Sequence, residues 1–180
     1  RKGKLLDLKD TGKNKKRLVF QAPTRGLMGY TSRFLTLTKG TGVINRLFHG
    51  YGKFEGEMDG RKNGALISMA TGKAVAFAIF NLQARGEMFV THNDPVYEGM
   101  IVGLSPKPGD MIINVMKGKQ LTNMRTQGTD ENVVLTPVRQ MSIAEQLSML
   151  NTDEALEITP KSCRLRKALL NPHDRKRQSK

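Results

Sequence analysis

The first twenty residues carry two short runs of apolar side chains with polar residues between them. Residues 5–8 contain three leucines, and residues 18–20 form the β-branched and aromatic run Leu-Val-Phe. The Thr-Gly-Lys-Asn stretch at 11–14 has the composition of a turn. This pattern predicts a β-hairpin.

After the hairpin the apolar spacing changes from that of a strand to that of a helix. Large side chains recur at positions 27, 30, 34 and 35, and Gly40 follows where a glycine commonly ends a helix. Residues 43–48, Val-Ile-Asn-Arg-Leu-Phe, then predict another strand. The order strand, strand, helix, strand is the second half of a split βαβ unit.

Seven glycines fall within residues 40–64, which makes this stretch the best position for a boundary between modules. Beyond it, helical spacing of apolar residues predicts a helix at 74–85 that Gly86 closes. Short apolar runs separated by proline and glycine predict strands at 65–69, 87–90, 99–104, 111–116 and 133–135. Residues 117–132 are polar and lack a period, so they predict a long loop.

Capping signals organise the last forty residues. Ser142 and Glu145 form a capping box, which predicts a helix up to about Leu150. Residues 156–158 are strand-like, and Thr159-Pro160 predicts the start of another helix over 161–170. Residues 171–180 are expected to form a basic tail. Together these elements indicate an α+β fold, with a partial ferredoxin-like module followed by a mixed β-sheet or barrel-like domain with a few helices.

The charge is concentrated at the two ends of the chain. The formal net charge is +14, and residues 1–17 and 161–180 each contain eight basic side chains against two and one acidic ones. Residues 140–160 contain no lysine or arginine. Charge polarised in this way predicts a surface directed towards a polyanion such as RNA, while the alternative is a solvated tail without a partner.

Composition excludes several classes of protein. Hydrophobic residues make up 38% of the chain, and the longest apolar run is seven residues, at 74–80, so we expect no membrane-spanning segment. Cys163 is the single cysteine, which excludes an intrachain disulfide and favours a reducing compartment, the cytoplasm or an organellar stroma. The chain begins Arg1-Lys2-Gly3 without a methionine or a signal peptide, so we expect a piece of a longer protein.

Catalytic and metal-binding patterns are weak. The chain has no phosphate loop of the form G-x-x-x-x-G-K-[ST], and its three histidines, His49, His92 and His173, lack metal-ligand spacing. We therefore expect no catalytic, cofactor or metal site in this chain. The enzyme alternative is a small hydrolase that uses Asp153 with His49 or His92, and no motif spacing supports it.

Two segments have the chemistry of nucleic-acid contacts. Residues 25–30, Arg-Gly-Leu-Met-Gly-Tyr, place a cation and two glycines at a predicted helix start, which suits either phosphate binding or close packing of the helix. The loop at 117–132 is rich in lysine, arginine, asparagine, glutamine and threonine, which suit contacts to phosphate, ribose and base edges.

At these residues the sequence closely resembles the BipA/TypA family of translational GTPases, which are related to elongation factor G. The resemblance runs through Leu18–Tyr30, Gly40-Thr41-Gly42, Leu47–Tyr51, Tyr97–Met100, Gly118–Glu131 and Leu165–Lys167, in the family's order. It covers nearly the whole chain, and the combined signal is stronger than any one motif.

The resemblance implies a domain organisation. Residues 1–55 are similar to the later part of the last ferredoxin-like domain, called domain V in elongation factor G, and residues 56–180 to the family's own C-terminal domain. The family's GTPase domain would lie upstream, so GTP and Mg²⁺ are expected only there. The first strand and helix of the ferredoxin-like domain would precede Arg1, which would leave a sheet edge unpaired.

The resemblance also implies a function and a set of contact residues. It implies a monomeric module of a stress-related GTPase that docks in the ribosomal A site, contacts 23S-type rRNA and the A-site tRNA acceptor end, and acts in translation, large-subunit assembly or both. The loop contacts would be Lys117, Lys119, Asn123, Arg125, Thr129 and Asp130. The basic rRNA contacts would be Arg164, Arg166, Lys167, Arg175, Lys176 and Arg177. The ferredoxin-like face towards the ribosome would include Arg25, Gly26, Gly29 and Tyr30.

A different class of function stays open from the residues alone. The basic ends could bind an acidic protein partner, which would make the chain a protein–protein scaffold. Nuclease treatment separates the two readings, because a complex with RNA is lost and a complex with protein survives.

Overall fold

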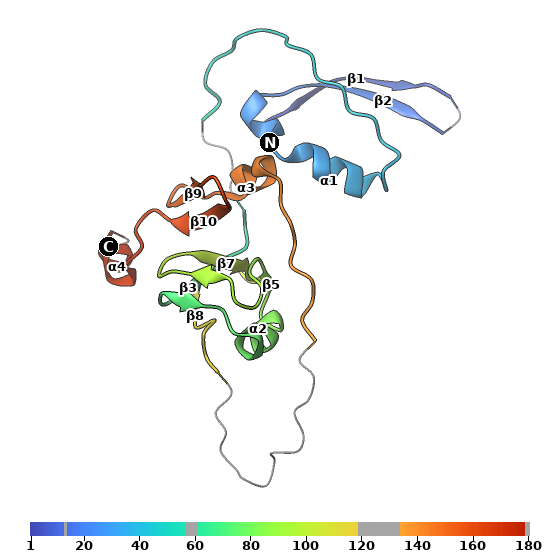
Figure 1. Cartoon of the computed structure of the whole chain (residues 1–180). Helices are drawn as coiled ribbons and strands as arrows, with labels where there is room; N and C mark the ends of the chain where they lie inside the picture. Colours follow the sequence, from blue (N-terminus) through green and yellow to red (C-terminus); the bar gives the residue numbers. More distant parts are fainter. Residues whose placement is uncertain (13, 57–60, 119–133, 179–180) are drawn as a thin grey trace. The chain divides into compact units, whose positions relative to one another are not determined.

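The chain folds into two units that we describe separately. The structure, a computed structural model, describes residues 1–12, 14–56, 61–118 and 134–178 (Figure 1). The first unit comprises residues 1–60 together with 142–149, and the second comprises residues 61–141 and 150–180. The chain therefore leaves the second unit to contribute one helix to the first and then returns.

The first unit contains the predicted hairpin and helix. Strands β1 (Lys4–Asp10) and β2 (Lys16–Gln21) pair antiparallel, which confirms the hairpin. A 3₁₀ turn, Thr24–Leu27, precedes helix α1 (Tyr30–Leu37). Helix α3 (Ile143–Met149) comes from the later part of the sequence and belongs to this unit.

The strand predicted at residues 43–48 is wrong, because this segment lies outside any helix or strand. An extended segment forms a β-strand only when an adjacent strand hydrogen-bonds to its backbone N–H and C=O groups. The sheet that contains the described hairpin consists of β1 and β2. Leu47 and Phe48 are accordingly 94% and 78% exposed.

The first unit has almost no buried side chains of its own. Among its described residues, only Gly26 is buried. The pairing of Leu5 with Phe20 and of Leu8 with Leu18 places four large apolar side chains on one face of the hairpin, and each is more than half exposed. The hydrophobic core of the described chain therefore lies in the second unit.

The second unit is built on a four-stranded mixed sheet in the order β5-β7-β3-β8. Its strands are β3 (Ala65–Ser68), β5 (Glu87–Met88), β7 (Ile101–Leu104) and β8 (Met111–Ile113). Strand β3 pairs antiparallel with β7 and parallel with β8. Two short strands, β4 (Gly72–Lys73) and β6 (Pro95–Val96), form a separate pair. The predicted strand at 133–135 begins outside the described residues, and positions 134 and 135 are not in a strand.

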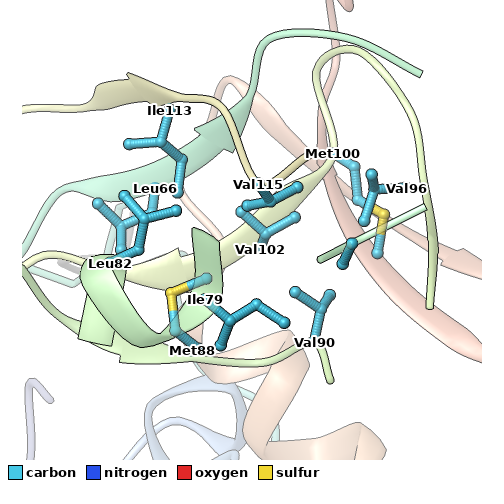
Figure 2. Close-up of a cluster of buried hydrophobic side chains, with 11 residues drawn as sticks. Leu66, Ile79, Leu82, Met88, Val90, Val96, Met100, Val102, Ile113 and Val115 are labelled. Carbon is cyan, nitrogen blue, oxygen red and sulfur yellow. The ribbon is translucent and has the colours of Figure 1, made fainter. Parts of the chain in front are cut away.

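Both faces of this sheet are covered. Successive residues of a strand point to opposite faces, so Leu66 joins one apolar cluster while Ala65 and Ile67 join another. Helix α2 (Ala76–Gln83) contributes Ile79 and Leu82 to the first cluster, part of which Figure 2 shows. Burial on both faces explains why β3 is apolar at consecutive positions, and burying a side chain such as Leu66 or Ile67 contributes about 1.5–3 kcal/mol.

The second cluster receives Leu156 and Leu165 from a C-terminal hairpin. This hairpin consists of β9 (Glu154–Ile158) and β10 (Cys163–Lys167), which pair antiparallel. A bridge between Met100 and Arg166 joins it to the main sheet.

The helix predicted over residues 161–170 is therefore wrong. Thr159 does not cap a helix, because its hydroxyl accepts a hydrogen bond from the backbone N–H of Ser162, 3.0 Å away, and closes the turn between β9 and β10. Side chains along β10 alternate between more and less buried positions, which is the pattern of a strand. The sequence prediction instead followed the Thr159-Pro160 pair, which is typical of a helix start. The real Pro-initiated helix is α4 (Pro172–Gln178), where the Asn171 side chain accepts a hydrogen bond from the His173 N–H.

The remaining helix predictions and the fold class are confirmed. The Ser142 hydroxyl accepts a hydrogen bond from the Glu145 N–H, and the Glu145 carboxylate accepts one from the Ser142 N–H, as a capping box requires. The described residues contain four α-helices and several small sheets without a closed barrel, so the fold is α+β. No helix in the described ranges is long and apolar enough to span a membrane.

Gly29 provides a test of the contact between α1 and α3. Its φ is +63°, and a Cβ atom there would collide with the Ser148 side chain. Gly29→Ala is expected to lose more stability than Gly12→Ala, which has a similar φ of +76° but no neighbouring atom. The control should cost about 1–2 kcal/mol from backbone strain alone. Urea unfolding measures both, and equal losses would contradict the packing role.

Candidate nucleic-acid interface

The loop residues predicted to contact RNA lie mostly outside the described residues. Lys117 is described and exposed. Lys119, Asn123, Arg125, Thr129 and Asp130 fall in the segment 119–133, which the structure does not describe. Their role stays a prediction from the sequence.

Strand β10 presents two of the predicted arginines on one face. Arg164 and Arg166 alternate with the buried Leu165 and Lys167, so they point to the opposite side of the strand. Two strand residues span about 6.6 Å, which places the guanidinium groups on neighbouring positions of one surface. Glu157 lies directly across from Arg164 in the paired strand.

Glu157 is the acidic centre of this arginine face. Its Oε2 accepts a hydrogen bond of 2.6 Å from the Tyr97 hydroxyl and lies 4.0 Å from Nε of Arg166. Burial, followed by the hydrogen bond and the negative charge of Glu157, raises the pKa of Tyr97 to about 12. The phenol therefore keeps its proton at neutral pH and remains a hydrogen-bond donor.

Lys167 corrects the predicted set of basic contacts. Its side chain is 1% exposed, and its ammonium group lies 2.5 Å from Asp110, 2.7 Å from Asp153 and 2.8 Å from Glu154. Because β10 turns this side chain inward, Lys167 does not offer a surface charge to phosphate. It holds three carboxylates together instead.

Arg61 completes this ion cluster, which the sequence analysis did not predict. Its guanidinium donates two hydrogen bonds of 2.5 Å to the Glu154 carboxylate. Asp110 also accepts a hydrogen bond of 2.7 Å from the Ala65 N–H, and Glu154 accepts one of 3.1 Å from the Asn151 N–H. The contributing residues lie up to 106 positions apart, and the sequence analysis had named Asp153 and Lys167 only for other roles.

The three carboxylates of the cluster are close enough together to be considered as ligands of a metal ion. Within the described part of the chain, Asp110, Asp153 and Glu154 form the one acidic group that meets this condition. The Lys167 ammonium, however, contacts all three carboxylates. The Lys167 ammonium therefore provides the positive charge among the three carboxylates, and these groups fit a structural cluster of ion pairs.

The cluster shifts the pKa values of its members towards the charged forms. Burial alone would raise the pKa of Asp110, but hydrogen bonds from Lys167 and Ala65 and the nearby positive charges outweigh it and lower the pKa. Burial alone would lower the pKa of Lys167, but hydrogen bonds to Asp110, Asp153 and Glu154 raise it. Both groups are charged at neutral pH. The enzyme alternative is weakened as well, because Asp153 is paired with Lys167.

The three basic residues near the C-terminus lie on α4. Arg175 donates hydrogen bonds to the carbonyl oxygens of Leu169 and Leu170, so it anchors the helix to the preceding residues. Arg177 is exposed and lies 4.0 Å from Asp174, and Lys176 is exposed as well. The expected basic tail is thus a short helix over most of its length.

In residues 25–30 the glycines allow close packing of the chain, which was one of the two roles that the sequence suggested. The backbone of Arg1 lies against Gly26, and Ser148 lies against Gly29, so neither position has room for a Cβ atom. Arg25 stacks on Phe54 at 4.7 Å, and Tyr30 lies beside the guanidinium of Arg1 at 5.2 Å. Arg25 is exposed and remains able to meet a partner.

Comparison with known proteins covers the whole chain. The family model described as Elongation factor G C-terminus matches residues 1–62, and the model described as TypA/BipA C-terminal domain matches residues 63–172. Proteins named large ribosomal subunit assembly factor BipA from Salmonella typhimurium, Haemophilus influenzae and Buchnera aphidicola are 45%, 43% and 44% identical over 181 aligned residues. The alignments cover 100% of this chain but only 30%, 29% and 30% of these relatives.

Removing the charge of Lys167 should destabilise the second unit strongly. Lys167→Met removes the ammonium group that contacts all three carboxylates and leaves the buried Glu154 without it, and breaking a buried ion pair costs about 3–5 kcal/mol. Lys161→Met is the control, because Lys161 is exposed and its loss should change stability by less than about 0.5 kcal/mol. Urea unfolding distinguishes them, and a change under 1 kcal/mol for Lys167→Met would contradict the role of the cluster.

Tyr97 should contribute a pH-dependent term to stability. Because its folded pKa of about 12 exceeds the ordinary value of 10.0, its contribution is full below pH 10 and is lost as the pH rises towards 12. The melting-temperature advantage of the unaltered chain over Tyr97→Phe should therefore shrink between pH 10 and pH 12. Tyr51→Phe, at a fully exposed position, is the control. An advantage that stays constant over this range would contradict the assignment.

Proposed function

Because the chain belongs to the TypA/BipA family, we propose that it is an RNA-binding module that docks on the ribosome as the C-terminal part of a translational GTPase. Phosphate contacts hold it in place, and the loop at 117–132 probes the shape of the bound RNA. The module contributes by binding at a defined place on the ribosome and not by catalysing a reaction. The parent protein acts under stress, in translation, in large-subunit assembly or in both.

The observation that carries this proposal is the similarity over the entire chain. The two family models together match residues 1–172, and the relatives bear the name large ribosomal subunit assembly factor. We assign residues 1–55 to the later part of a ferredoxin-like domain and residues 56–180 to the family-specific domain.

The described basic side chains support contact with a polyanion. In the C-terminal region, Lys161, Lys176 and Arg177 are exposed, and the half-buried Arg164 and Arg166 share one face of β10. Lys167 is turned inward and is excluded from this surface. Phosphate contacts of this kind orient a protein on RNA without reading its sequence.

The proposed partners follow from the same family. The loop residues contact 23S-type rRNA near the peptidyl transferase centre and the A-site tRNA acceptor end, and the region 25–30 faces the base of the ribosomal stalk. The chain acts as a monomer. GTP and Mg²⁺ bind a segment outside this chain, because these 180 residues contain no G-x-x-x-x-G-K-[ST] sequence.

Ribosome binding should depend steeply on salt. If about six phosphates are neutralised, the affinity falls about a thousandfold between 50 and 200 mM salt. Co-sedimentation with ribosomes across a salt series measures this, and a salt-independent affinity would contradict the mechanism. The Lys117→Ala/Lys119→Ala/Arg125→Ala variant, called the loop variant below, should bind more weakly with a smaller salt slope.

Two controls separate the alternatives. Lys15→Ala/Lys16→Ala/Arg17→Ala removes the same number of charges from the N-terminal hairpin region, so it corrects for net charge. Equal binding by the loop variant and the unaltered chain would move the RNA contact to the basic ends. Survival of a pulled-down complex after nuclease treatment would favour an acidic protein partner.

A further inference from the structure

The two guanidinium groups on the arginine face of β10 are held to different degrees. Nη1 of Arg166 donates hydrogen bonds to the carbonyl oxygens of Lys167 at 3.1 Å and Ala168 at 3.3 Å, and its Nε lies 4.0 Å from Oε2 of Glu157. Among the contacts of the described residues, none engages Nη2 of Arg166 or the guanidinium of Arg164. Arg166 is therefore held along one edge, and its other edge is available to a ligand.

The backbone of Arg166 is fixed from both sides. It pairs with Ala155 of β9 on one side and forms a bridge with Met100 on the other. The next residue, Lys167, donates its N–H to the Gly99 carbonyl at 2.9 Å. The remaining freedom of Arg166 lies in its side chain, which is 33% exposed. A long side chain loses rotamer entropy when it binds, so contacts that hold it beforehand strengthen the binding.

The carboxylate of Glu157 is itself held in place. The Tyr97 hydroxyl donates a hydrogen bond of 2.6 Å to Oε2, which is the same oxygen that faces Arg166. The pKa of Tyr97 reflects the closeness of these groups, because burial and Glu157 raise it. The positive charges of Arg166 and Arg164 act in the opposite direction. A chain of contacts thus runs from Tyr97 through Glu157 to Arg166.

We propose that Glu157 is a positioning residue for RNA binding: oriented by Tyr97, it holds the Arg166 guanidinium so that the available edge meets a phosphate of the RNA backbone. This inference rests on the proposed function. Glu157 itself does not contact the RNA. Its negative charge alone would repel a polyanion, so positioning and simple electrostatics predict opposite effects when this charge is removed.

The test is Glu157→Gln in co-sedimentation with ribosomes. Loss of a negative charge strengthens binding if charge alone matters, whereas loss of positioning should weaken it about fivefold, the size of one net hydrogen bond. Glu98→Gln is the control, because it removes the same charge from a side chain without a hydrogen bond or ion pair among the described residues. It should bind at least as tightly as the unaltered chain. Unchanged or tighter binding by Glu157→Gln would overturn the inference.

The salt dependence separates positioning from a purely structural role. If Arg166 no longer neutralises its phosphate, Glu157→Gln should lower the slope of log affinity against log salt by about 0.7–0.9, as Arg166→Ala should. In the Arg166→Ala background, Glu157→Gln should cause no further loss, because the group that it positions is already absent. Weaker binding with an unchanged slope, or a further loss in that background, would overturn the inference.

The orienting role of Tyr97 has its own test. Tyr97→Phe keeps the ring and removes the hydrogen bond to Glu157, so it should weaken ribosome binding in the same direction. Full binding by this variant would contradict the part assigned to the hydroxyl. Melting temperatures of all variants exclude general unfolding as the cause.

The failure of this inference is distinguishable from that of the proposed function. If the unaltered chain does not bind ribosomes, both fail. If Arg166→Ala weakens binding and Glu157→Gln does not, only the positioning role of Glu157 fails. If Arg164→Ala/Arg166→Ala binds as tightly as the unaltered chain, the positioning role fails while ribosome binding stands on other contacts. A complex that survives nuclease treatment would assign the arginine face to an acidic protein and overturn the inference.

Discussion

The ammonium group of Lys167 lies within 2.5–2.8 Å of carboxylates from three positions of the second unit. Asp110 directly precedes β8, while Asp153 and Glu154 lie at the start of β9. Lys167 ends β10, so one buried cation connects an edge of the main sheet to both strands of the C-terminal hairpin. Desolvated ions are stable only when they are paired and hydrogen-bonded, so the buried members Lys167, Glu154 and Arg61 depend on one another. The covering of the second sheet face by the hairpin depends on this cluster in turn.

The same cluster explains why similar basic residues have different roles within five positions of β10. Alternation along the strand turns Lys167 into the carboxylates and Arg164 and Arg166 to the opposite side. A count of positive charges treats these residues as equivalent. Their different roles become visible only when residues 163–167 are recognised as a strand. The helix predicted over 161–170 did not place Lys167 on the opposite side from Arg164 and Arg166.

The sequence correctly predicted the elements whose formation depends mainly on residues close together in the chain. The Ser142–Glu145 capping box, the first hairpin and α2 depend on neighbours within a few residues, so their sequences identify them. The Thr159-Pro160 pair shows the limit, because the same residues suit a helix start and a tight turn. What decides is the distant apolar cluster that buries Leu165. The ion cluster was not predictable for the same reason, since Arg61 and Glu154 meet only after the sheet has formed.

The first unit shows what happens when the tertiary partner is lacking. Its hairpin has an apolar face, and residues 43–48 have the composition of a strand, yet the hairpin's apolar side chains and Val43, Leu47 and Phe48 stay exposed. The described residues of this unit therefore bury few apolar side chains, and its glycines make close contacts instead. Gly29 can approach Ser148 of α3 because it has no side chain and accepts a positive φ.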